Sequence, residues 1–190
     1  MPNVTVIGVP EPTGGVIAGV VGERATIDTI VAGSGEHRAA RFLELTQADW
    51  DGMVGGIKAA FKAAQRMAAS YVERGEPGRI IFVSSTASVR PVHGATLAAT
   101  AGGFLTTLAQ VAAVELGPHA VTVNVVAPGF VGDERFADAT PLGRPPAAGD
   151  VAEVCAFLAS EGAAGVTGAV VPVDGGLWIT KSPGGSPLLA

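Results

Sequence analysis

The chain has 190 residues, of which 48% are hydrophobic and only 15% are charged, and this length suits one domain with one core. A formal net charge of −5 argues against nucleic acid as the partner, because a phosphate backbone calls for basic stripes. The single cysteine, Cys155, excludes an intrachain disulfide and a cysteine-based metal cluster, and its apolar neighbours predict a buried structural thiol.

The predicted elements alternate between short apolar runs and helical segments. Runs that are rich in β-branched residues and closed by Gly, Ser or Pro predict strands, whereas segments with capping residues and a final Gly predict helices. In chain order we expect strand 4–9, helix 14–25, strand 27–32, helix 47–73, strand 79–83, helix 96–116, strand 121–126, helix 150–160 and strand 169–173. This alternation predicts an α/β fold, with a Rossmann-like parallel sheet of about five strands between two helical layers.

The ends of the chain bear on its domain organisation and its location. Residues 1–180 are expected to form a single domain, and residues 181–190, rich in Gly, Pro and Ser, a flexible tail. No stretch approaches the roughly 18 consecutive apolar residues of a membrane span, and no charged-then-apolar signal precedes a cleavage site at the N-terminus. We therefore expect a cytoplasmic protein without a membrane partner.

A family resemblance rests on four segments, which are FLELTQADWDGM, GRIIFVSSTASV, VTVNVVAPGFV and PLGRPPAAGDVAEVCAFLASEGAAGVTGAVVPVDGG. In their order and spacing they resemble the short-chain dehydrogenase/reductase family, from residue 26 to residue 178. The resemblance implies a Rossmann-like fold that binds a nicotinamide dinucleotide, and a pair of long helices that form a four-helix contact between subunits. It also implies a sheet in which the first strand lies beside the fourth, with the second and third strands outside it.

This chain departs from the family most clearly at the cofactor-binding turn. Members open with a turn of the form GxxxGxG, whose glycines let backbone N–H groups approach the pyrophosphate at a helix N-terminus. The nearest candidate here is residues 10–15, PEPTGG, in which two prolines remove N–H donors and Glu11 adds a negative charge. We therefore expect no bound nicotinamide cofactor.

The start of the chain resembles the family's third strand, the helix after it and its fourth strand, over residues 4–32. On this interpretation the first two βα units of the family, which hold the adenosine half of the cofactor, are absent. Met1 and a plausible first strand favour a natural short form over a truncated gene model.

The catalytic pair of the family, Tyr-x-x-x-Lys, is replaced in this chain. In the family the lysine ammonium lowers the tyrosine pKa, so that the phenol exchanges protons near neutrality. Leu97 and Ala101 stand at these two positions, and the one tyrosine, Tyr71, falls in the preceding long helix. The asparagine that the resemblance places in that helix falls near Gly56, and the Asn-Asn-Ala-Gly turn is replaced by residues 31–34. We therefore expect no redox chemistry of the family's kind.

Three residues remain as candidates for a rebuilt site. Ser85 survives from the family's catalytic set, His93 lies in the loop that borders its substrate pocket, and Asp133 stands where a threonine often holds the nicotinamide amide. A turn serine, a solvated histidine and a surface carboxylate are the simpler interpretations, but together the three could transfer protons in non-redox chemistry. His37 and His119 flank turns and are interpreted as surface residues. No metal is expected, because no pair of ligand residues has metal-binding spacing on one element.

The catalytic residues of the family are replaced, whereas the segments that form its fold are retained. This combination predicts a non-catalytic subunit. It would pair with itself or with an active, full-length family member through helices 47–73 and 96–116. The first alternative is a non-redox enzyme, such as a lyase, hydratase, isomerase or cyclase, that reuses the family's substrate pocket for a small-molecule ligand. The second alternative is an oxidoreductase subunit that borrows a site from another subunit.

The missing units also predict how the sheet closes. A gap would leave two rows of unpaired backbone groups, so strand 4–9 is expected to move inward and pair in parallel with strand 27–32. The strands would then follow chain order, and a right-handed crossover would place helix 14–25 on the face of the two long helices. Part of the opposite face would stay exposed, which again favours an oligomer.

Overall fold

The computed structural model describes residues 2–180. One sheet contains five parallel strands, which are β1 (Val4–Ile7), β2 (Thr29–Gly33), β3 (Gly78–Val83), β4 (Val121–Pro128) and β5 (Val170–Val173). Their order in the sheet is their order in the chain, and Val4 lies opposite Thr29. The α/β fold, the five-stranded parallel sheet and the pairing of the first two strands are therefore confirmed. The predicted tail at 181–190 lies outside the described residues.

Four helices connect the strands in turn, and they are α1 (Thr13–Arg24), α2 (Gln47–Arg74), α3 (Thr96–Leu116) and α4 (Ala148–Leu158). α2 begins at a capping box, in which Asp49 N donates to Thr46 Oγ1 at 3.2 Å and Thr46 N donates to Asp49 Oδ2 at 2.9 Å. It ends at Gly75, whose φ of 66° is left-handed and whose N–H donates to the carbonyls of Tyr71 and Val72. The predicted helix 47–73 agrees with these bounds to within one residue, because a capping residue before the segment and a glycine after its last turn mark its two ends.

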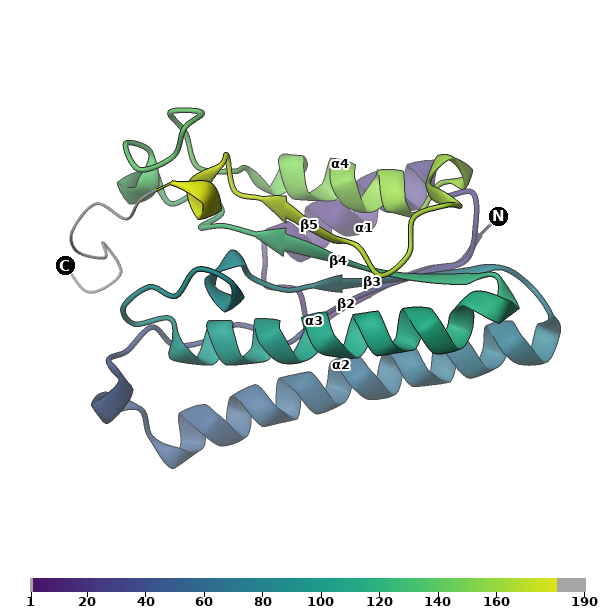
Figure 1. The fold of residues 1–190 in the computed structure, drawn as a ribbon, viewed down its shortest axis with the longest axis horizontal. Helices are drawn as coiled ribbons and strands as arrows, with labels where there is room; N and C mark the ends of the chain where they lie inside the picture. The colour runs from purple at the N-terminus through teal and green to yellow at the C-terminus, as the bar shows by residue number, and fades with distance from the viewer. Residues whose placement is uncertain (1, 181–190) are drawn as a thin grey trace.

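Helices cover both faces of the sheet, as Figure 1 shows, with α2 and α3 on one face and α1 and α4 on the other. The buried cluster between the sheet and the pair α2 and α3 includes Ile30, Phe82, Leu105, Ala109 and Val123. The buried cluster on the other face includes Ile17, Val21, Val31, Ile81 and Cys155. Cys155 is fully buried there, and burial raises its pKa to about 12, so the prediction of a structural thiol is confirmed.

α1 lies on the opposite face from the predicted one. It packs beside α4, away from α2 and α3, and its Ile17 and Val21 are fully buried there (Figure 1). Because all strands advance in one direction across the sheet, the connections through α1 and α4 have the opposite hand from those through α2 and α3. The right-handed rule fails here, and α1 instead covers the apolar surface that Val31 and Ile81 form beside α4. The second face of the sheet is thus covered by the chain itself.

α3 is unusually apolar for a helix at the surface. Residues Thr96–His119 form the one helix in the described part of the chain that is long and apolar enough to span a membrane, by length and composition alone. Polar residues such as Thr106 and Gln110 interrupt this helix, so it holds no run of 18 consecutive apolar residues. Leu105 and Ala109 face the sheet and are fully buried, whereas Phe104 and Val114 point outward and are exposed. The apolar character of α3 is thus divided between the core and an outer face.

Candidate functional site

The carboxyl ends of β1 and β2 meet at the edge where open α/β sheets bind ligands. Gly8 follows β1 with a φ of 62°, and a Cβ added there would lie 2.3 Å from the carbonyl O of Gly33. A Cβ at Gly33 would lie 2.4 Å from Gly8 O, to which Gly35 N also donates at 2.7 Å. The two strand ends are therefore in direct backbone contact, which only glycine permits.

The N-terminus of α1 is occupied by a side chain of the chain itself. Gly15 N donates to Glu11 Oε2 at 3.0 Å, and Gly14 N donates to Pro10 O at 3.0 Å. A helix N-terminus attracts anions through its free N–H groups and its dipole, and here a carboxylate already holds that place. Pro12 supplies no N–H. A phosphate group would therefore meet an occupied donor and a negative charge.

The turn between β1 and α1 keeps two of the three glycines in the GxxxGxG pattern. Gly8 and Gly14 stand at the first and third glycine positions, and Pro12 stands at the second. Residues 10–15, the candidate turn in the sequence, leave out Gly8, because Gly8 lies within the apolar run that predicts the strand. The pattern begins at Gly8, since the glycine-rich turn follows the strand directly.

The positions of the catalytic tyrosine and lysine are filled by packed apolar side chains. Leu97 and Ala101 of α3 are each 1% exposed, and they form a cluster with Met53 and Ile57 of α2. Leu45 packs against the edge of this cluster. A phenol or an ammonium group here would be desolvated between two helices. The two replacements are thus part of the packing that joins α2 to α3.

Gly56 on α2 stands near the position that the resemblance gives to an asparagine. A Cβ at Gly56 would lie 1.8 Å from the carbonyl O of Ser34, in the loop after β2. No larger side chain fits without a backbone shift, so the close approach of α2 to this loop depends on glycine.

Gly56→Asn is therefore expected to lower the free energy of unfolding by about 3 kcal/mol, since its Cβ must displace a backbone carbonyl. Urea denaturation followed by circular dichroism measures this loss. Gly55→Asn is the matched control, because a Cβ at Gly55 meets nothing within 4 Å. Equal stability of the two variants would contradict the close approach.

The three candidates for a rebuilt site lie in two connections, with Ser85 and His93 between β3 and α3 and Asp133 between β4 and α4. Ser85 follows β3, and its Oγ accepts a hydrogen bond from Ala87 N at 3.2 Å, so it caps the 3-10 turn that begins there. His93 is exposed in the loop before α3. Asp133 accepts a hydrogen bond from Arg135 Nη2 at 2.7 Å, and this guanidinium holds the Asp133 pKa below its ordinary value. The joint role of the three in non-redox chemistry stays a prediction.

A serine–histidine contact lies in the loop after β2. Ser34 Oγ and His37 Nε2 are 2.9 Å apart, and both residues are partly buried. His37 is therefore not the simple surface histidine that its place beside a turn indicates, and no sequence pattern announces a contact between two loop residues three apart. Within residues 2–180, no three His, Cys, Asp or Glu side chains gather as a metal site would need.

Comparisons of sequence place the chain beside known oxidoreductases. Residues 10–178 match the sequence profile of a family described as Enoyl-(Acyl carrier protein) reductase. L-xylulose reductase from Bos taurus is 34% identical over 168 residues, which cover 81% of this chain and 69% of that protein. The match therefore extends over most of this chain but leaves about a third of the relative unmatched.

Comparisons of structure agree with the sequence. Acetoin dehydrogenase from Salmonella typhimurium superposes with a TM-score of 0.75 at 29% identity, over 90% of this chain and 73% of its own. A putative oxidoreductase from Escherichia coli K-12 superposes with a TM-score of 0.82 at 22% identity, over 95% of this chain and 99% of its own. The second comparison shows the fold alone, in a chain of closely matching size.

Proposed function

Because this chain belongs to the short-chain dehydrogenase/reductase family, we propose that it is a redox-inactive member that serves as a subunit of an oligomer. The observation that carries the proposal is the apolar cluster of Leu97, Ala101, Met53 and Ile57. No side chain in this cluster can donate or relay a proton to a carbonyl oxygen. A subunit with this cluster has no acid–base pair of the family's kind.

The turn between β1 and α1 supports the same proposal. β1 lies beside β2, and α1 lies on the face of α4, which is the arrangement that the family's sheet order gives to its first strand beside its fourth. We therefore assign β1 and α1 to the family's first βα unit, in place of the third strand and its helix. The missing βα units then fall between α1 and β2. Pro12 and the Glu11 carboxylate thus stand where the cofactor's pyrophosphate would bind.

The outer face of α2 and α3 supports the role as a subunit. Trp50, Val54 and Phe61 lie along one side of α2 and are partly exposed, and Phe104 and Val111 on α3 are about half exposed. Apolar residues at such helical spacing form a continuous stripe, and large bare patches are rare on monomers. The partner on this face is a second copy of this chain or a full-length relative, and the assembly is expected in the cytoplasm.

An assay of NADH and NADPH oxidation tests the proposal. Purified protein is expected to oxidise neither NADH nor NADPH above the blank with L-xylulose, acetoin or a 3-oxoacyl thioester. A full-length relative assayed in parallel shows that the substrates and cofactors are competent. Cofactor oxidation by this chain that disappears in the Ser85→Ala variant would overturn the proposal, because it would place redox chemistry at its own site.

A further inference from the structure

We propose that Ser34 and His37 form a nucleophile–base pair that cleaves carboxylic esters or thioesters. Ser34 Oγ and His37 Nε2 are 2.9 Å apart, the distance at which a histidine can take the proton of an attacking hydroxyl. The pair follows β2 directly, so it lies at the carboxyl edge of the sheet, where open α/β folds bind ligands. Neither residue belongs to the apolar cluster on α3, so this activity does not depend on the redox proposal.

The protonation state of His37 suits the role of a base. Burial lowers the pKa of His37 below its ordinary value, so the imidazole is neutral at pH 7. A neutral imidazole offers one ring nitrogen as an acceptor. His37 Nε2 lies at the Ser34 hydroxyl, so it accepts that proton when the other ring nitrogen carries the N–H.

The loop that carries the pair is anchored at its first residues. Gly35 N donates to Gly8 O at 2.7 Å, which ties the loop to the end of β1. The carbonyl of Ser34 lies so close to Gly56 that a Cβ there would stand 1.8 Å from it, which ties the loop to α2. Contacts of this kind hold a nucleophile in one geometry, and fixed geometry is a large part of the rate that an enzyme provides.

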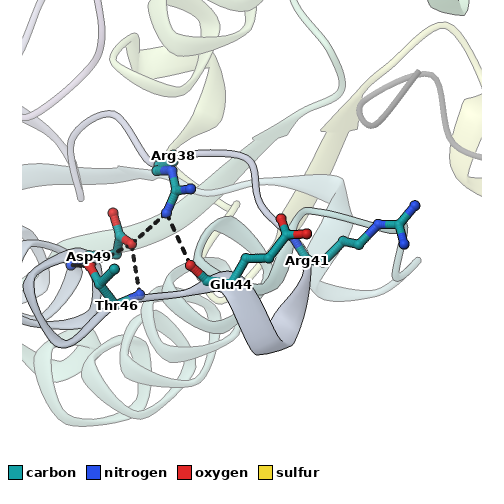
Figure 2. Close-up of polar contacts among 5 residues, drawn as sticks. All are labelled: Arg38, Arg41, Glu44, Thr46 and Asp49. Carbon is teal, nitrogen blue, oxygen red and sulfur yellow. Dashed lines mark hydrogen bonds and ion pairs between the residues drawn. The ribbon is translucent and has the colours of Figure 1, made fainter.

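A second anchor follows the histidine directly. Arg38 Nη1 donates to Asp49 Oδ2 at 2.9 Å and to the carbonyl O of Glu44 at 3.3 Å, as Figure 2 shows. Asp49 is itself held by the capping box with Thr46 at the start of α2. Arg38 is therefore a positioning residue, because it fixes the backbone beside His37 to the first turn of a long helix.

The loop that carries the pair is not covered at the residue after the serine. A Cβ added at Gly35 would meet nothing within 4 Å, so space is open beside that residue. The backbone amides of Glu36 and His37 donate no hydrogen bond to any described residue. Free amides next to a nucleophile are the usual donors to the oxyanion that forms when a carbonyl is attacked.

The reaction proceeds in two balanced steps. Ser34 Oγ attacks the carbonyl carbon of the ester while His37 Nε2 takes the hydroxyl proton, and the imidazolium then gives that proton to the departing alcohol or thiol. Water next attacks the acyl-serine, and His37 takes one proton from the water and returns it to Ser34 Oγ. The products are a carboxylic acid and an alcohol or thiol, and no oxidant or reductant is consumed.

A fluorophosphonate probe tests the pair in the whole protein, since Ser34 Oγ would displace fluoride from its phosphorus. The site of labelling is found by peptide mass spectrometry, and hydrolysis of p-nitrophenyl acetate is followed in parallel. We expect labelling at Ser34, its complete loss in Ser34→Ala, and labelling about 100-fold slower in His37→Gln. Arg38→Ala is expected to slow labelling by about 10-fold through lost positioning.

Two matched controls lie at the other end of the sheet. Ser160→Ala and His119→Gln alter a partly buried serine and an exposed histidine far from β2 in the chain, and they are expected to label like the wild type. Thermal unfolding confirms that each variant is folded. An unlabelled Ser34 in folded wild-type protein would overturn the proposal, as would labelling of Ser34 at an unchanged rate in His37→Gln.

Discussion

The double variant Leu97→Tyr/Ala101→Lys is expected to be much less stable than the wild type and to remain without reductase activity. Leu97 and Ala101 are each 1% exposed in an apolar cluster between α2 and α3. A lysine there must either bury its charge or force the helices apart, and the larger side chains overpack the contact. We expect the free energy of unfolding to fall by about 4 kcal/mol.

Urea denaturation measures this loss, and Leu97→Met is its control, because a swap that conserves volume costs less than about 1.5 kcal/mol. A large loss of stability would show that positions 97 and 101 are now part of the hydrophobic core. A double variant as stable as the wild type, with new NADPH-dependent turnover, would show that the site is still intact around positions 97 and 101.

Phe104→Glu is expected to convert the assembled protein to monomer. Phe104 is 46% exposed on α3, on the same outer face as Val111. A central aromatic residue in an interface contributes about 2 kcal/mol or more, and a buried unpaired carboxylate adds to the loss. The dissociation constant is expected to rise by at least about 30-fold, measured by analytical ultracentrifugation over a concentration series.

Phe157→Glu is the control for this result. Phe157 is 49% exposed, close to the value for Phe104, but it lies on α4 at the opposite face of the sheet. It is expected to leave the assembly unchanged. A wild-type protein that is monomeric at micromolar concentration, or an assembly that only Phe157→Glu disrupts, would refute the proposed interface.

Local patterns predicted most of the secondary structure. Thr46 and Asp49 mark the start of α2, and Gly75 marks its end, because capping depends only on residues a few positions apart. The strands are apolar runs, since a parallel sheet covered on both faces buries every residue of its central strands. The order of the five strands also followed from the sequence, because an unpaired strand edge is costly.

The face of α1 could not be predicted in this way. Its sequence, TGGVIAGVVGER, is apolar on several sides, so it does not indicate which surface the helix covers. The face that α1 covers depends on Val31 of β2 and Ile81 of β3. These two residues form one apolar surface only once the sheet has formed. The usual hand of a connection therefore did not predict the face on which α1 lies.

The site shows the same division between local and long-range information. Leu97 and Ala101 were predicted as replacements because they occupy fixed positions in a motif, but their packing on Met53 and Ile57 joins residues at least 40 positions apart. The Glu11 carboxylate at Gly15 N was predicted only as an unfavourable charge. The contact between Ser34 and His37 depends on a loop conformation that no periodic pattern describes.

Calorimetric titration of NADH and NADPH into the purified protein tests the central claim most directly. Pro12 replaces a glycine of the phosphate turn, and the Glu11 carboxylate accepts the N–H of Gly15 at the start of α1. The account predicts no heat of binding for either cofactor up to millimolar concentration. A dissociation constant in the micromolar range for either one would contradict it.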